Sequence, residues 1–248
     1  MELEDLVAVI TGAGRGIGKT IAEKFVKEGA KVALWDVEGE SAQAAAREID
    51  PSGQRTLSAH VDVTREEEVN RAVSGVVERL GRIDILVNNA GRAIHKKIEE
   101  MSLEDFEAVV RLNLTGVFIC CKAVTPVMKK QGRGKIITIS SLGGRTGRPG
   151  VGVNYAASKA GVIGLTQTLA KEIGPSGINV NAIAPGPVMT GVAMQYPPEA
   201  RAIWNAGRAI DRDGLPEDVA EAAIFLASHR SDWVTGVSLD VNGGILIR

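Results

Sequence analysis

The segment Leu6-Val-Ala-Val-Ile-Thr-Gly-Ala-Gly-Arg-Gly-Ile-Gly18 decides the fold class. Its apolar start, rich in β-branched residues, predicts a buried strand over residues 6–11, and a helical pattern follows over 16–28. The glycines between them permit a tight turn and let a phosphate approach the positive N-terminus of the helix. The segment therefore predicts a strand-turn-helix unit that binds the pyrophosphate of a dinucleotide. Tight packing of strand on helix is the alternative explanation of these glycines.

Short apolar runs alternate with longer helical patterns along all 248 residues. Six further strands are expected at 31–36, 56–61, 83–88, 135–140, 178–184 and 237–241, and helices at 16–28, 65–80, 102–130, 156–173 and 216–227. Several strands are apolar without alternation, as in parallel sheets covered on both faces. Right-handed crossovers then predict the α/β class. We expect one domain, residues 1–248, with a doubly wound (Rossmann) seven-stranded parallel sheet and helices on both faces.

Composition points to a small-molecule partner. With 44% hydrophobic residues and a formal net charge of −1, the chain has a large core and no electrostatic bias toward nucleic acid or membrane. No apolar run approaches the roughly 20 residues of a membrane span, and the N-terminus lacks a signal-peptide pattern, so we expect a cytoplasmic location. The adjacent Cys120 and Cys121 are expected to be buried free thiols, and no metal is predicted.

Acidic residues end the second and third strands. Asp36 lies 18 residues after Gly18, where a carboxylate can accept hydrogen bonds from the adenosine ribose and repel a 2′-phosphate. We therefore expect NAD in preference to NADP, although Arg15 in the glycine turn could contact a 2′-phosphate. Asp62 could accept from the adenine amino group, or Asp62 or Thr64 could cap the helix at residue 65.

The spacing Gly-x-x-x-Gly-x-Gly, together with Asn88-Asn-Ala-Gly91 after the fourth strand, resembles the short-chain dehydrogenase/reductase family over nearly the whole chain. The resemblance implies a structural role for Asn88 and cofactor contacts for the three residues after it; a simple turn is the alternative. The residues expected to contact the dinucleotide in this half of the chain are Gly12, Arg15, Gly16, Ile17, Gly18, Asp36, Asp62, Val63, Asn89, Ala90 and Gly91.

Tyr155-Ala-Ala-Ser-Lys159 begins a helical pattern, and its i, i+4 spacing places the phenol and the ammonium on one face. A nearby ammonium favours the phenolate, so Lys159 is expected to lower the pKa of Tyr155 from its ordinary value near 10. A surface Tyr and Lys are the alternative.

A serine hydroxyl at the end of the fifth strand can donate to the substrate oxygen. The resemblance selects Ser141, after which the loop to Tyr155 is one residue longer than in many relatives; Ser140 is the substitute.

Asn113 places a polar amide on an otherwise apolar helix face, where it needs a partner. The resemblance implies that it holds a water connecting Lys159 to solvent, which completes a catalytic tetrad of Asn113, Ser141, Tyr155 and Lys159; a buried structural amide is the alternative. Tyr155 is also counted among the cofactor-binding residues, and Lys159 is expected to hold the nicotinamide ribose.

The Pro-Gly turn after the sixth strand resembles the family's nicotinamide-binding turn, and the residues assigned to the cofactor there are Pro185, Gly186, Val188 and Thr190. The resemblance implies that residues 187–213 close over the substrate as a mostly apolar lid. Its apolar side chains are Met189, Val192, Met194, Tyr196 and Trp204. His95, near the same rim, is interpreted as an exposed loop histidine.

Together these features predict an NAD(H)-dependent oxidoreductase that interconverts a secondary alcohol or hydroxyacid and its ketone, with Tyr155 as acid/base. A 3-oxoacyl-acyl-carrier-protein reductase is the alternative. Such reductases commonly use NADPH and present basic residues to their carrier, so Asp36 and Ser176 weigh against it, while a basic run over 129–135 could serve as a docking patch. A non-catalytic dinucleotide-sensing protein is the second alternative. The resemblance also implies a homotetramer built on 102–130, 156–173 and the C-terminal strand and tail.

Overall fold

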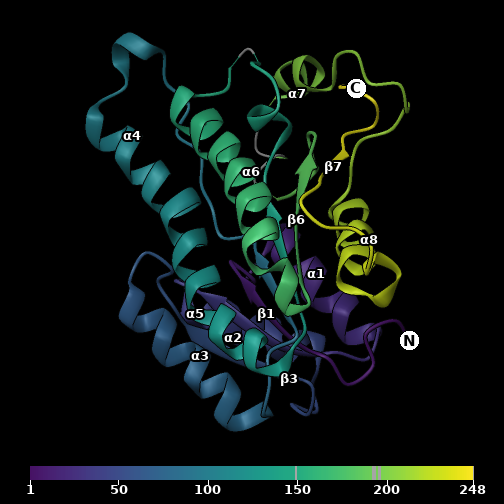
Figure 1. Ribbon diagram of the computed structural model, residues 1–248. Helices are drawn as coiled ribbons and strands as arrows, with labels where there is room; N and C mark the ends of the chain where they lie inside the picture. The colour runs from purple at the N-terminus through teal and green to yellow at the C-terminus, as the bar shows by residue number, and fades with distance from the viewer. Residues whose placement is uncertain (149, 192–193, 195–196, 248) are drawn as a thin grey trace.

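A single seven-stranded parallel sheet forms the centre of the computed structural model, which describes residues 1–148, 150–191, 194 and 197–247 (Figure 1). The strands are β1 (Val7–Thr11), β2 (Lys31–Asp36), β3 (Thr56–His60), β4 (Ile85–Asn88), β5 (Gly134–Ile139), β6 (Ile178–Pro185) and β7 (Ser238–Val241). Their order is β3-β2-β1-β4-β5-β6-β7. The chain runs outward from β1 to β3 and then crosses to β4 on the other side of β1. The expected doubly wound sheet is thereby confirmed, and its strand order reverses between β1 and β4.

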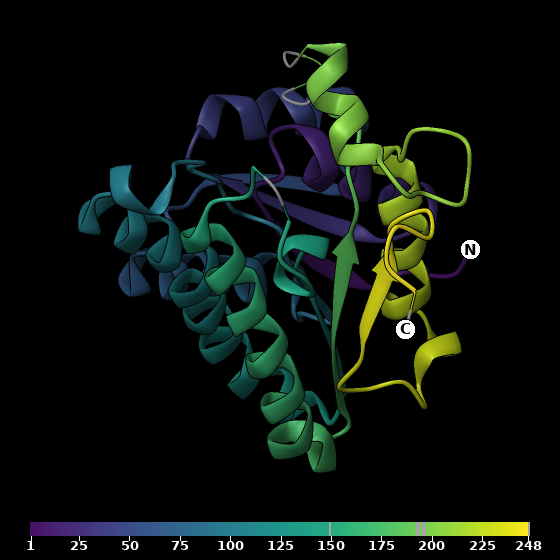
Figure 2. The ribbon, with the colours of Figure 1, turned by 90° about the horizontal axis from the view of Figure 1, so that it is seen from above.

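Helices cover both faces of the sheet (Figures 1 and 2). They are α1 (Gly16–Lys27), α2 (Gly39–Ile49), α3 (Glu66–Leu80), α4 (Leu103–Val110), α5 (Gly116–Gln131), α6 (Val153–Ile173), α7 (Pro198–Asn205) and α8 (Pro216–Ala227). Buried side chains of α1, α2 and α8 form one core cluster with the sheet, and those of α3, α5 and α6 form the other. Every residue of β1 is buried, because alternate side chains enter opposite clusters. This explains the unbroken apolar run.

The pattern over 102–130 is interrupted in the structure. Between α4 and α5 the residues Arg111–Thr115 form a π-helix, η2, which widens one turn. The continuous stretch Leu103–Gln131 has the length and mean hydropathy (1.5) of a membrane span, which the sequence interpretation did not foresee. However, 44% of its apolar window is buried, and α5 packs against α3, β5 and α6 as a core helix does.

Two helices were not predicted. The buried positions of α2 are the alanines Ala42, Ala45 and Ala46, which give a weak hydrophobic stripe in the sequence. The other, α7, lies inside the segment after β6 that showed no regular pattern. The helix α2 covers β2 and β3 on one face of the sheet, whereas α7 lies in the segment that follows the end of β6 (Figure 2).

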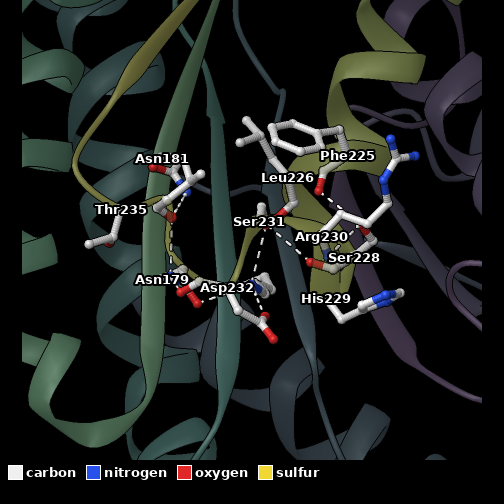
Figure 3. A network of polar contacts seen from close by, with 12 residues as sticks. Asn179, Asn181, Phe225, Leu226, Ser228, His229, Arg230, Ser231, Asp232 and Thr235 are labelled. Carbon is white, nitrogen blue, oxygen red and sulfur yellow. Dashed lines mark hydrogen bonds and ion pairs between the residues drawn. The ribbon is translucent and has the colours of Figure 1, made fainter.

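A polar network holds the opposite end of the sheet, where β6 begins (Figure 3). Asn181 Nδ2 donates to the carbonyl of Val234 at 2.9 Å, and the Val180 amide donates to Thr235 Oγ1 at 3.0 Å. The ammonium of Lys135 on β5 pairs with Asp232 at 2.7 Å. These contacts fasten the connection between α8 and β7 to the sheet, away from the end where the strands of the site terminate.

Candidate active site

The glycine turn after β1 is fixed by hydrogen bonds from Asn89, which follows β4. The side-chain Nδ2 of Asn89 donates to the carbonyls of Thr11 at 3.0 Å and Gly12 at 2.9 Å. A Cβ at Gly18 would overlap the Gly12 carbonyl oxygen, so Gly18 is required by packing. Gly16 differs, because its φ of +58° requires glycine and a Cβ there would meet only the Thr190 methyl, at 3.8 Å. Close packing therefore explains the glycine at position 18. The positive φ explains Gly16, where the backbone is left open to a ligand.

The start of α1 fits a pyrophosphate. The residue before its first turn, Arg15, makes no side-chain capping hydrogen bond, so within the described residues no side chain caps the first amides of the helix. Thr190, from the turn after β6, lies close to Gly16. The glycine turn, assigned to the pyrophosphate, and the turn after β6, assigned to the nicotinamide, thus lie close together at the positive end of α1.

The carboxylate of Asp36 is fixed at the end of β2. Its Oδ2 accepts from the Gly14 amide and its Oδ1 from the Glu38 amide, both at 2.9 Å. Glu38 in turn pairs with Arg15 at 2.8 Å and accepts from Ser41 Oγ at 3.2 Å. Sequence reasoning missed this role of Glu38, although an acid two residues after Asp36 was a visible signal. Two carboxylates therefore lie where the adenosine ribose is expected.

The residues after β3 form a turn and pack on α5. Asp62 Oδ1 accepts from the Thr64 amide at 2.9 Å and from Thr64 Oγ1 at 2.8 Å, which closes the turn before α3. The alternative that Asp62 or Thr64 caps the helix is wrong, because the N-cap residue of α3 is Arg65 and it makes no side-chain capping hydrogen bond. The buried Val63 side chain packs over Gly116 at the start of α5. The adenine contact of Asp62 and the cofactor contact of Val63 stay predictions.

The Asn-Asn-Ala-Gly segment after β4 ties the middle of the sheet together. Asn88 Nδ2 approaches Cys121 Sγ and Thr138 Oγ1, each at 3.4 Å, which is a structural role. Thr11 Oγ1 accepts from the amides of Asn89 and Ala90, both at 3.0 Å. Thr11 was not singled out in the sequence, yet it joins the ends of β1 and β4. Gly91, the last residue of the segment, lies beside the tyrosine-lysine pair. A Cβ at this position would lie 3.5 Å from the Lys159 ammonium.

The two cysteines are buried free thiols on α5. Burial raises the pKa of both thiols, that of Cys121 to about 12. Neither is therefore a thiolate at neutral pH, and the sulfur of Cys121 contacts the side-chain amide of Asn88.

The two candidate serines, Ser140 and Ser141, have different hydrogen-bond partners. Buried Ser140 donates its hydroxyl to the Lys159 carbonyl at 2.8 Å, which fastens β5 to α6. Ser141 Oγ accepts from the Gly143 amide at 3.0 Å and hydrogen-bonds the Tyr155 side chain. The structure therefore places Ser141, and not Ser140, beside the phenol.

Tyr155 lies in the first turn of α6, and Lys159 follows one turn later. The ammonium of Lys159 is buried, donates to the Ile139 carbonyl at 2.6 Å, and lies 5.8 Å from the centre of the Tyr155 ring. Burial lowers the pKa of Lys159 to about 8. Burial also raises the pKa of Tyr155 above its ordinary value, and the hydrogen bond to Ser141 opposes this only in part. The expectation of a lowered pKa for Tyr155 is therefore wrong for this arrangement, because desolvation of the phenol outweighs the opposing hydrogen bond to Ser141.

Asn113 lies in the π-helix and is fully buried. Its Oδ1 accepts from the Arg92 amide and its Nδ2 donates to the Arg92 carbonyl, both at 2.9 Å, and Nδ2 also contacts Ser158 Oγ at 3.1 Å. These bonds supply the partners that a buried amide needs. They also join the loop after β4 to α6 beside Lys159. A π-turn at such a position is a frequent mark of functional sites.

The segment after β6 crosses the end of the sheet. A Cβ at Gly186 would meet Asn242 Cα at 2.9 Å, and Val188 forms a parallel bridge with Gly214, which closes the base of the expected lid. Arg148, in the loop after Ser141, donates to the Trp204 carbonyl on α7. Met189 is half-buried and Met194 is exposed, whereas Val192 and Tyr196 lie outside the described residues.

A pocket of about 480 Å³ opens beside this segment. It is lined by Pro187 and Val188, by side chains of 205–219, and by the C-terminal residues 240–247. Neither Ser141 nor Tyr155 lines it. The pocket therefore borders the expected nicotinamide turn but not the phenol.

His95 contacts the site in a way that the sequence did not indicate. The residue is exposed, as expected, yet its ring makes an edge contact with Tyr155, with centres 6.0 Å apart and planes at 70°. Its Nδ1 accepts from the Gly152 amide at 3.0 Å. Only tertiary structure brings the loop after β4 to the start of α6.

Comparison with known proteins assigns the chain to a family. The sequence profile described as Enoyl-(Acyl carrier protein) reductase matches residues 12–246. The 3-oxoacyl-[acyl-carrier-protein] reductase FabG of Thermotoga maritima is 41% identical over 247 residues, 100% of both chains, and a short-chain dehydrogenase/reductase of Armillaria gallica is 40% identical over 97% of this chain and 95% of its own. The crystal structure of gox2181 superposes with a TM-score of 0.95 at 36% identity, covering 98% of this chain and 96% of that one. With a dinucleotide turn, a serine and a Tyr-x-x-x-Lys pair at the carboxyl end of one parallel sheet, this protein belongs to the short-chain dehydrogenase/reductase family, whose members are nicotinamide-dependent oxidoreductases acting on CH–OH groups.

Proposed function

We propose that this protein reduces the ketone of a 3-oxoacyl thioester to the 3-hydroxyacyl product, with NADH as the reductant. Relatives named 3-oxoacyl-[acyl-carrier-protein] reductase, 40–41% identical along the chain, support the substrate class. The chemistry rests on one observation, the contact of Ser141 with Tyr155 above a buried Lys159. This revises the expectation of a general dehydrogenase of secondary alcohols or hydroxyacids, of which only the hydroxyacid substrate is kept below as the second candidate.

The proposed reaction joins a hydride and a proton to the two ends of a carbonyl group. A nicotinamide bound at the turn after β6 would supply the hydride to the ketone carbon. Ser141 and Tyr155 donate hydrogen bonds to the ketone oxygen, and Tyr155 transfers its proton to that oxygen as charge develops. The nearby ammonium of Lys159 stabilises the phenolate that is left. We propose that Asn113 holds the water through which the proton is restored.

The electrostatics of Tyr155 support the reductive direction. Because burial raises its pKa, the phenol is protonated at neutral pH and ready to act as an acid. Reduction needs this form, whereas oxidation of an alcohol needs the phenolate as a base. The arrangement therefore favours proton donation to a ketone near pH 7 and oxidation only at alkaline pH.

The preference for NADH rests on Asp36. Its carboxylate is held by the amides of Gly14 and Glu38, and Glu38 adds a second negative charge beside it. A 2′-phosphate at this place would face two carboxylates, whereas ribose hydroxyls can donate to them. This supports NAD(H) in spite of Arg15.

A free hydroxyacid or its ketone is the second candidate, and Arg148 favours it. Its guanidinium lies in the loop between Ser141 and Tyr155 and is half-buried, and burial lowers its pKa. Among the described residues no carboxylate pairs with it; its one bond is to the Trp204 carbonyl. A partly desolvated cation without an anion can take up the carboxylate of a substrate.

Three substrates separate the candidates. Acetoacetyl-N-acetylcysteamine, free acetoacetate and a simple methyl ketone are offered with NADH or NADPH, and the fall of absorbance of the reduced cofactor is followed. The proposal predicts the highest kcat/KM for the thioester with NADH. A higher kcat/KM for acetoacetate would replace it with the second candidate, and a preference for NADPH would overturn the assignment of Asp36.

We propose further that the chain forms a homotetramer in the cytoplasm, built on α4 to α6 and the C-terminal strand and tail. Exposed apolar side chains on these elements support this, among them Leu103 (71% exposed) and Phe118 (52%). Light scattering after size exclusion should give four times the chain mass, and Phe118→Glu should lower it. Val37→Glu, which changes an exposed residue after β2, is the matched control. A monomeric wild-type protein would contradict the proposal.

A further inference from the structure

His95 contacts the helix that carries Tyr155 at two points. Its Nδ1 accepts from the amide of Gly152, the residue that precedes the first turn of α6. Its ring makes an edge contact with the Tyr155 ring at 6.0 Å. The approach is close because Gly152 has no side chain; a Cβ there would overlap the Ile94 carbonyl oxygen. The imidazole is therefore held in one place relative to the phenol.

These contacts leave one nitrogen of His95 available as a donor. A neutral imidazole carries its proton on only one nitrogen, and Nδ1 is occupied as an acceptor. The proton is therefore on Nε2. Burial lowers the pKa of His95, which keeps the ring neutral at pH 7, while the residue retains exposed surface. The site thus presents a second hydrogen-bond donor, one ring contact away from the phenol.

We infer that the Nε2–H of His95 binds the second carbonyl oxygen of the substrate and so selects 1,3-dicarbonyl compounds over isolated ketones. This inference rests on the proposed function. In a 3-oxoacyl thioester a single methylene separates the ketone from the thioester carbonyl. When Ser141 and Tyr155 hold the ketone oxygen, the thioester oxygen lies a few bonds away and requires its own donor. His95, whose ring contacts Tyr155, supplies it from the loop after β4.

The test compares two substrates on the same enzyme preparation. One is acetoacetyl-N-acetylcysteamine, and the other is the ketone in which a methylene replaces the thioester carbonyl. His95→Asn offers an amide oxygen to the Gly152 amide but has no group in place of Nε2–H. His95→Phe keeps the ring beside Tyr155 without either nitrogen. His229→Phe, which changes an exposed histidine at the opposite end of the sheet, is the control.

The ratio of the two kcat/KM values is the readout, because it does not depend on the folded fraction. Both His95 variants should lower kcat/KM about tenfold for the thioester, the effect of one lost hydrogen bond of ~1.4 kcal/mol. Their kcat/KM for the isolated ketone should stay within about twofold of wild type, as should both values for the control. An equal loss on both substrates, or no loss on the thioester, would overturn the role of His95 alone. No turnover of the thioester by the wild-type protein would overturn the proposed function, and this role with it.

Discussion

The guanidinium of Arg15 is paired with the carboxylate of Glu38, with Nη2 to Oε1 at 2.8 Å and Nη1 to Oε2 at 3.2 Å. The pair is exposed, 71% and 50% for the two side chains, so it contributes about 0–1 kcal/mol and can be broken. Asp36 is held more firmly, by two backbone amides. The preference between NADH and NADPH should therefore depend first on the carboxylate of Asp36. It should depend second on whether Arg15 stays paired with Glu38 or is available to a 2′-phosphate.

The double variant Asp36→Ser, Glu38→Gln should shift the ratio of kcat/KM for NADH over NADPH by at least about tenfold toward NADPH, ~1.4 kcal/mol of differential binding. It removes both carboxylates and leaves Arg15 free for a 2′-phosphate. Glu38→Gln alone should shift the ratio less, because Asp36 remains. Steady-state kinetics with the two cofactors give the ratios. An unchanged ratio in the double variant would show that Asp36 does not set the preference.

Tyr155→Phe should lower kcat about 10²–10⁴-fold, because it removes the phenol that is proposed to transfer its proton to the substrate oxygen. The dissociation constant for NADH, measured by fluorescence, should change little. Ser140→Ala is the comparison for Ser141→Ala: the first removes a bond to the Lys159 carbonyl, and only the second removes a contact with the phenol. Full activity of Tyr155→Phe would contradict the proton transfer.

The rate of reduction should depend on Lys159 through pH. The pKa of Lys159 is lowered to about 8, so its ammonium is present below that pH and is lost above it. The pKa of Tyr155 is raised above 10, so the phenol stays protonated throughout. The value of kcat/KM for the ketone should therefore be level at neutral pH and fall as the pH rises through about 8. A profile that rises over this interval would assign the essential group differently.

Asn113→Ala should lower the free energy of unfolding by about 1–3 kcal/mol, because it leaves the Arg92 amide and carbonyl without their buried partner. Urea denaturation followed by circular dichroism measures this change. Asn205→Ala is the matched control, since it removes an exposed contact with Asp213 and should cost less than about 0.5 kcal/mol. Equal losses in the two variants would argue against a special role for the amide in the π-helix.

Arg148→Ala should loosen α7, because the bond from Arg148 to the Trp204 carbonyl joins this helix to the loop before α6. Hydrogen exchange followed by mass spectrometry should show faster exchange in peptides covering 197–206 and no change in peptides of α3. Arg148→Lys keeps the charge without the planar group and should give an intermediate rate. Unchanged exchange in the alanine variant would show that α7 is held by other contacts.

Patterns that are local in the chain predicted most of the architecture. The seven strands were predicted to within two residues at each end, because each one is a short run with its own local signature, including β3 and β7, which are only partly buried. The helix α2 has no such signature, since only alanines face the core. The π-helix also escaped prediction, because the hydrophobic period continues through Arg111–Thr115 although the backbone widens there.

The sequence by itself determined the fold and the residue types of the site: a glycine turn, an acid after β2, and a serine, tyrosine and lysine at known spacings. Tertiary structure alone decided how these groups are solvated and paired. It gave Ser141 a hydrogen bond with the Tyr155 side chain and Ser140 a hydrogen bond with the Lys159 carbonyl. It also raised the pKa of Tyr155, whereas the spacing to Lys159 predicted a lowered pKa. It also brought His95 against Tyr155. The physical reason is that hydrogen bonds and desolvation depend on every atom around a group, and most of those atoms come from distant parts of the chain.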